Sequence, residues 1–145
     1  MDSVPPVGSA GEDAGSAAPE PLSATTLSAS LTVEMIQTSL DWYRDMLGFT
    51  VTRTFEREGK LFAVSLRAGV VPFLLTQDNG ERGTGRLKGE GISLRLTTSQ
   101  NVDDLATRIK ERGWKLETEP FDFMGARAFR VRDPDGFKLV ISSEV

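Results

Sequence analysis

The chain has 145 residues, of which 39% are hydrophobic and 26% charged, so it can form one globular domain. It contains no histidine and no cysteine, which excludes disulfides, thiolate nucleophiles, cysteine-ligated zinc or iron–sulfur sites and imidazole acid–base groups. The formal net charge is −4, and all of it comes from the first 22 residues, which contain four acidic residues and no basic one. The neutral remainder does not indicate a nucleic-acid partner, and no apolar run reaches the ~18 residues of a membrane-spanning helix.

Residues 1–24 are predicted to form a disordered acidic tail. They are rich in Ala, Gly, Ser and Pro and offer too little apolar surface to offset the entropy of ordering. They lack the basic start and apolar stretch of a secretory signal and the arginines of a transit peptide. We therefore expect a cytoplasmic protein with no membrane partner.

The first half of the body alternates strand and helix patterns. Residues 28–33 alternate between polar and apolar with period two, which predicts a strand. Apolar residues at helical spacing over 36–47 predict a helix, with Thr38 or Ser39 as its N-cap and Gly48 as its stop. Three further strands are expected, at 49–57, 60–67 and 71–76.

The second half repeats this order. A glycine-rich linker over 78–89 leads to an alternating strand at 91–96. A helix follows from Val102, with Asn101 or Ser99 as its N-cap and Gly113 as its stop. Three further strands are expected, at 114–118, 126–132 and 137–142.

This order indicates a duplicated βαβββ unit. The segment Ser30–Val33 recurs 63 residues later as Ser93–Leu96. One unit of about 55 residues buries too little surface to be stable alone, so the two copies should pack together. We predict one domain with module one at 25–77, the linker at 78–89 and module two at 90–145.

Three stretches resemble the vicinal oxygen chelate superfamily, which includes glyoxalase I, extradiol dioxygenases and bleomycin-resistance proteins. Residues 39–49 are similar to the family's first helix and its Leu-Gly-Phe exit, and 102–113 to its second helix. Residues 127–137 are similar to its Asp-Pro-Asp-Gly turn and the strand before it. The resemblance covers about 27–142 and implies an α+β fold, in which two βαβββ modules form a curved mixed sheet around a cavity.

The resemblance also implies where a metal would bind. Family enzymes hold it at four positions, on the first and last strand of each module. Those positions correspond to Ser28, Gly91, Leu74 or Leu75, and Val140, none of which is a histidine or a carboxylate. We therefore expect no metal and no cofactor, and exclude metal-dependent glyoxalase and extradiol dioxygenase activity.

Strand parity predicts which side chains line the cavity. If Ser28 and Gly91 face inward, hydroxyl side chains and Arg95 line it, while the alternate apolar residues face the helices. Arg95 either holds an anionic group of a ligand or is neutralised by an acidic residue inside the sheet. Residues 119–125 are expected to form a loop at the cavity mouth, and Arg127, Arg130 and Arg132 are interpreted as surface charge on alternating faces. The predicted ligand-binding residues are Ser28, Ser30, Ser93, Arg95, Phe121, Phe123, Met124, Lys138 and Val140.

Three functions agree with these residues. The first is a metal-independent protein that binds a small aromatic or anionic molecule, as in the drug-resistance branch of the family. The second is a metal-independent isomerase, cyclase or lyase of secondary metabolism, with Asp122 or Glu56 as its acid–base group. The third is a structural or regulatory module whose cavity has collapsed. By the resemblance, we expect a homodimer in each case.

Overall fold

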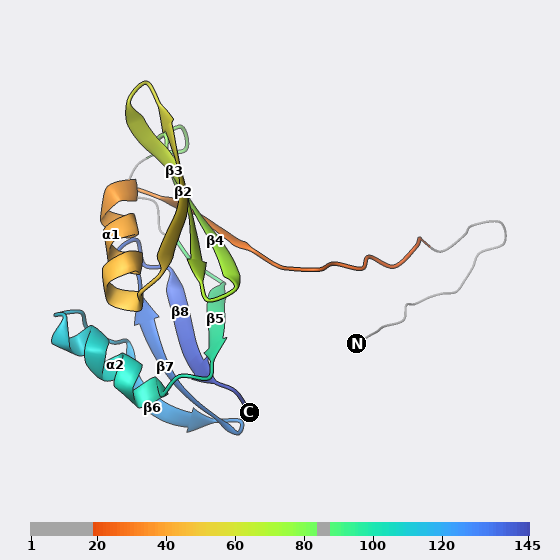
Figure 1. Cartoon of the computed structure of the whole chain (residues 1–145), viewed down its shortest axis with the longest axis vertical. Helices are drawn as coiled ribbons and strands as arrows, with labels where there is room; N and C mark the ends of the chain where they lie inside the picture. The colour runs from red at the N-terminus through yellow and green to blue at the C-terminus, as the bar shows by residue number, and fades with distance from the viewer. Residues whose placement is uncertain (1–18, 84–87) are drawn as a thin grey trace.

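A computed structural model describes residues 19–83 and 88–145, so most of the predicted tail and part of the predicted linker lie outside the described residues. The described chain forms two helices and eight strands in the predicted order (Figure 1). Module one contains β1 (Ala29–Val33), α1 (Ile36–Leu47), β2 (Thr50–Arg57), β3 (Lys60–Ala68) and β4 (Val71–Gln77). Module two contains β5 (Ser93–Thr98), α2 (Val102–Glu111), β6 (Thr118–Phe123), β7 (Ala126–Arg132) and β8 (Lys138–Ser143).

The strands form two four-stranded mixed sheets with the same topology. Sheet A has the order β1-β4-β3-β2 and sheet B the order β5-β8-β7-β6. In each sheet the first and last strands of the module pair in parallel, and the other pairs are antiparallel. Both helices lie on the same side of the two sheets (Figure 1). The predicted duplication and the α+β fold class are confirmed.

The start of α1 differs from the sequence-based prediction. Met35 is its N-cap residue and provides no side-chain cap, so the assignment of the cap to Thr38 or Ser39 is wrong. The acceptor comes instead from β4, where the Gln77 Oε1 atom accepts a 3.0 Å hydrogen bond from the Ile36 amide. The end of α1 is as expected, because Gly48 has the left-handed φ of 73° that a helix stop requires.

The predicted termini of α2 are confirmed. The Asn101 Oδ1 atom accepts a 2.9 Å hydrogen bond from the Asp104 amide, which makes Asn101 the N-cap rather than Ser99. After the helix, Gly113 has a φ of 89° and the Trp114 amide bonds back to the Ile109 carbonyl. Both ends of α2 are therefore set by residues within or beside it.

The prediction for the strand after α2 is wrong. The structure places β6 at Thr118–Phe123, where a strand at 114–118 and a loop at 119–125 were expected. The pairing of β6 with β7 is irregular between Thr118 and Phe121, so Pro120 lies where its missing N–H interrupts no regular ladder. The turn that follows is made by Met124 and Gly125, both with positive φ.

Both modules contribute to one hydrophobic core between the sheets and the helices. The indole rings of Trp42 and Trp114 lie 5.4 Å apart across the two modules. Leu31 and Val33 of β1 and Leu139 and Ile141 of β8 are buried, as strand parity predicted. Neither described helix is long and apolar enough to span a membrane.

Candidate functional site on the open face of sheet B

Each sheet has a second face, opposite the helices, and this face is open in the single chain. Along β5, the exposed Ser93, Arg95 and Thr97 alternate with the half-buried Leu94 and Leu96. On β1, Ser30 and Thr32 are exposed in the same way. Strand parity therefore identified the two faces correctly, but one chain leaves these polar residues in solvent.

Sheet B is hollowed on this face into a groove of about 410 Å³. The pairing of Ser93 with Lys138 and of Arg95 with Val140 places these four residues on one face. The adjacent strand β7 adds two arginines, since Arg130 pairs with Val140 and Arg132 with Lys138. The groove is lined by Gly91, Ile92, Ser93, Glu117, Arg130, Arg132, Lys138, Leu139 and Val140.

Most of the positive charge in this region is not neutralised. Arg132 forms an ion pair with Glu117, with 3.2 Å between nitrogen and oxygen. In the described part of the chain, Arg95, Arg130 and Lys138 form no ion pair. The Nη2 atom of Arg95 donates a 3.0 Å hydrogen bond to the Ser142 hydroxyl. The alternative in which an acidic residue of the sheet neutralises Arg95 is therefore wrong.

Two phenylalanines of β6 extend this face. The pairing of Phe121 with Ala128, two residues before Arg130, places the Phe121 ring on the same side as the arginines. The guanidinium carbon of Arg130 lies 5.3 Å from the centre of this ring. The Phe121 and Phe123 rings are 6.1 Å apart, and Phe123 is 45% exposed. The exposed Met124 lies in the turn between β6 and β7, so the segment predicted to be a mouth loop is mainly a hairpin.

Arg130 and Arg132 were not among the predicted ligand-binding residues. They were interpreted together with Arg127 as surface charge on alternating faces, but residues 130 and 132 are two apart and share a face. Arg127 lies toward α2 and forms ion pairs with Asp103 and Asp122, each 3.2 Å long. The spacing of two residues, which places both arginines on one face, was visible in the sequence, but the position of β7 beside β8 was not.

The structure separates the predicted site residues between the two sheets. Ser28 is exposed and precedes β1, while Ser30 lies on β1 and pairs with Leu74 of β4. Ser93, Arg95, Lys138 and Val140 lie together on sheet B. Of the predicted ligand-binding residues, the structure therefore brings together only those of module two.

The residues at the positions where family enzymes hold a metal do not suit an ion. Leu75 is fully buried toward the helices, and Leu74 and Val140 offer no donor atom. The pairing of Thr32 with Thr76 matches that of Arg95 with Val140, so the counterpart of Val140 in the repeat is Thr76, and the prediction of Leu74 or Leu75 is wrong. No group of three or more carboxylates suited to hold an ion occurs within 19–83 and 88–145.

Comparisons with solved structures agree with this fold. A virulence protein from Salmonella typhimurium is 25% identical, with a TM-score of 0.67 over 87% of this chain and 100% of its own. A glyoxalase/bleomycin resistance protein/dioxygenase superfamily member from Sphaerobacter thermophilus is 24% identical, with a TM-score of 0.66 over 83% and 98%. TioX from Micromonospora is 19% identical, with a TM-score of 0.64 over 83% and 97%.

No curated protein sequence matches the chain. The model of the Glyoxalase/Bleomycin resistance protein/Dioxygenase superfamily matches residues 25–141, which span both modules and all but the last residues of β8. The chain therefore belongs to the glyoxalase/bleomycin resistance protein/dioxygenase superfamily.

Proposed function

We propose that this protein binds a small aromatic anion on the open face of sheet B, without a metal ion and without converting it. The observation that carries the proposal is the set of three cations around the groove that form no ion pair with an acidic residue of 19–83 or 88–145: Arg95, Arg130 and Lys138. A guanidinium binds a carboxylate or phosphate through two parallel hydrogen bonds, and Arg130 is open to do so. The role in the cell would be sequestration, as in the drug-resistance branch of the family.

The phenylalanines support an aromatic ligand rather than a bare anion. Phe121 and Phe123 present their rings beside the cationic groove, and Phe123 is unusually exposed for a large apolar residue. Aromatic rings prefer offset or edge-to-face contact with one another, which a flat ligand would provide here. A ligand with a ring and an acidic group would satisfy both parts of the face.

The acid–base alternative has less support. The carboxylate that lines the groove is Glu117, and Arg132 holds it in an ion pair. Asp122 lies on the other side of β6 from the phenylalanines, where it is paired with Arg127. An isomerase, cyclase or lyase needs an available general acid or base next to its substrate, and neither residue is placed for that task.

A second copy of the chain would complete the site. Small-molecule sites commonly bury 70–90% of the ligand's surface, and one open sheet face cannot do this. In a homodimer, the open face of a sheet from the partner would cover the groove. We therefore expect two chains per particle, measured by light scattering during size-exclusion chromatography.

Isothermal titration with 2-naphthoate and its neutral analogue 2-naphthalenemethanol tests the proposal. Naphthoate should bind more tightly than the alcohol. The change Arg130→Gln should weaken naphthoate binding by roughly ten- to a hundredfold, the worth of a charged hydrogen bond, and leave the alcohol nearly unaffected. The matched control Arg57→Gln removes a cation stacked on Phe62, away from the groove, and should change neither affinity.

Several results would contradict the proposal. If naphthoate does not bind, or if the acid and the alcohol bind with equal affinity, the proposed anion site is wrong. Added zinc, nickel or iron should change neither the melting temperature nor the naphthoate affinity, so stoichiometric stabilisation by a metal would overturn the metal-free assignment. Naphthoate should be recovered unchanged after incubation, whereas its conversion would favour the enzymatic alternative.

A further inference from the structure

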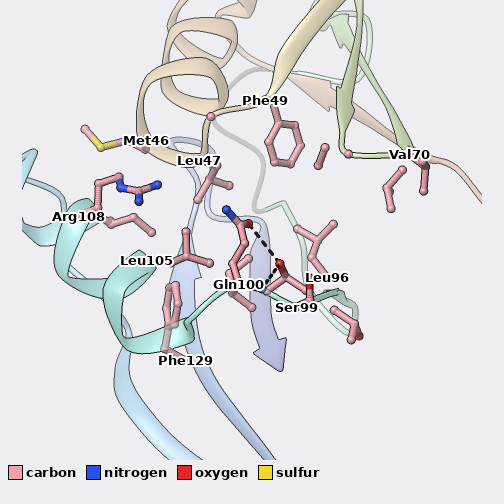
Figure 2. Close-up of a pocket in the computed structure, with 18 of the residues that line it drawn as sticks. Met46, Leu47, Phe49, Val70, Leu96, Ser99, Gln100, Leu105, Arg108 and Phe129 are labelled. Carbon is pink, nitrogen blue, oxygen red and sulfur yellow. Dashed lines mark hydrogen bonds between the residues drawn. The ribbon is translucent and has the colours of Figure 1, made fainter. Parts of the chain in front are cut away.

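A second hollow, of about 640 Å³, lies between the two modules and shares no lining residue with the groove on sheet B. Its walls come from the end of α1, the turn between β3 and β4, the end of β5 with the loop that follows, and α2 (Figure 2). Its volume is within the range of small-molecule sites.

The floor and most of the walls of the hollow are apolar, while the end of β5 and the loop after it add the polar Thr97, Thr98, Ser99 and Gln100. Phe129, Ile109 and Phe49 form part of the floor and are almost completely buried. On the walls, Leu105 is half-buried and Val70 is 92% exposed. Apolar side chains exposed around a recess mark a binding surface more often than single exposed residues do, because filling the recess removes them from water.

One cation lies at the end of this hollow. The guanidinium of Arg108 on α2 has neither an ion pair nor a hydrogen bond within the described residues. Figure 2 shows Arg108 beside Met46 at one end and Val70 at the other, with Leu47 and Leu105 between them. Glu144, after β8, also lines the hollow and forms no ion pair with Arg108.

We infer that the hollow between the modules binds a linear amphipathic carboxylate of the medium-chain fatty acid type. The carboxylate pairs with Arg108, and the alkyl chain lies along Leu47, Leu105 and Leu96 toward Val70. This occupant fits a mainly apolar hollow with Arg108, a cation that has no partner within 19–83 and 88–145, at one end. A flat face of a second copy would not reach the buried floor at Phe129.

Isothermal titration of the full chain with decanoate, below its micelle concentration, and with decanol tests the inference. Shortening the acid from decanoate to octanoate should weaken binding about fourfold per methylene removed. The change Arg108→Gln should weaken decanoate at least tenfold and leave decanol unchanged. The control Lys115→Gln removes an exposed cation that lines neither hollow and should have no effect.

Two further variants separate this site from its alternatives. Leu105→Trp should fill the hollow and weaken decanoate and decanol together, while Glu144→Gln should leave decanoate binding intact or strengthen it. Arg130→Gln should not change decanoate affinity, and naphthoate should not compete with decanoate. The inference is overturned if decanoate does not bind, if Arg108→Gln has no effect on it, or if the two ligands compete. It is also overturned if Leu105→Trp dissociates a dimer, because a second copy would then occupy the hollow.

Discussion

Tyr43, the single tyrosine of the chain, links the modules through one buried hydrogen bond. Its hydroxyl donates to the Oδ2 atom of Asp133 at 2.7 Å, and both residues are buried. The Oδ1 atom of Asp133 accepts from the amides of Asp135 and Phe137 within the turn before β8. The turn that resembles the family's Asp-Pro-Asp-Gly sequence is thus anchored to α1 of the other module.

Burial, followed by the charge of Asp133, raises the pKa of Tyr43 far above its usual value of about 10. Desolvation likewise raises the pKa of Asp133, which offsets the effect of the hydrogen bonds that it accepts. In both cases the folded state retains a proton that the unfolded chain releases. Both groups therefore stabilise the folded state at low pH. The contribution of Asp133 decreases as the pH rises above the ordinary carboxyl pKa, and that of Tyr43 decreases above about pH 10.

A spectroscopic titration at alkaline pH checks this environment directly. Absorbance of tyrosinate should not appear near pH 10 in the folded protein, because Tyr43 keeps its proton until the chain unfolds. In urea the same residue should titrate near its ordinary pKa of about 10. The variant Tyr43→Phe, which has no tyrosine, supplies the blank, and a reversible titration near pH 10 without unfolding would contradict the structure.

The alternation of residues along one strand predicts which face each side chain occupies, but it does not predict that Arg130 belongs to the site. Parity along one strand correctly placed Ser93 and Arg95 on the open face. Recognising Arg130 required the additional knowledge that β7 lies beside β8 and pairs Arg130 with Val140. The pairing partner of a strand is a long-range property, which local alternation does not contain.

The two helices of the repeat begin in different ways. In α2 the cap is local, since Asn101 accepts the hydrogen bond from Asp104. In α1 it is supplied from β4, where the Gln77 amide group bonds to the Ile36 amide and to the carbonyls of Glu34 and Asp78. Because Gln77 lies 41 residues after Ile36, no sequence motif next to the helix indicates that it provides the cap.

We expect Gln77→Ala to lower the free energy of unfolding by about 1–2 kcal/mol, the usual cost of losing a helix cap and its accompanying hydrogen bonds. Urea denaturation followed by circular dichroism measures the change. The control Gln37→Ala alters an exposed glutamine on α1 that bonds only within the helix, to Asp41, and should change stability by less than about 0.5 kcal/mol. Equal effects of the two substitutions would refute the capping role.

At the scale of the whole molecule, Lys88 joins the modules near their linker. Its buried ammonium group lies 3.0 Å from a carboxylate oxygen of Asp78 and 3.5 Å from one of Asp135 in the β7–β8 turn. It also donates to the carbonyl of Thr32, in β1, at 3.0 Å. A residue predicted to belong to a linker therefore forms part of the contact between the modules.

Replacing Lys88 by methionine should lower the free energy of unfolding by about 3–5 kcal/mol, because the buried carboxylate of Asp135 would lose its cation and Asp78 would lose one ion pair. Chemical denaturation at neutral pH measures this, with Lys60→Met in the exposed β2–β3 hairpin as the matched control. A loss for Lys88→Met of less than about 1 kcal/mol, or no greater than that of the control, would show that the ion pairs do not hold the modules together.

The duplicated βαβββ order, the helix stop at Gly48 and the buried or exposed face of most strands could be predicted from the sequence, because each depends on neighbours a few residues away. The position of β6 could not, since its two phenylalanines and Pro120 also agree with a loop until β7 is placed beside them. Three features arise only when distant strands and modules are brought together: the cations around the groove on sheet B, the ion pairs of Lys88, and the hollow with Arg108 at one end. Register between strands and packing between modules depend on complementary surfaces far apart in the chain, and only the folded structure shows which surfaces meet.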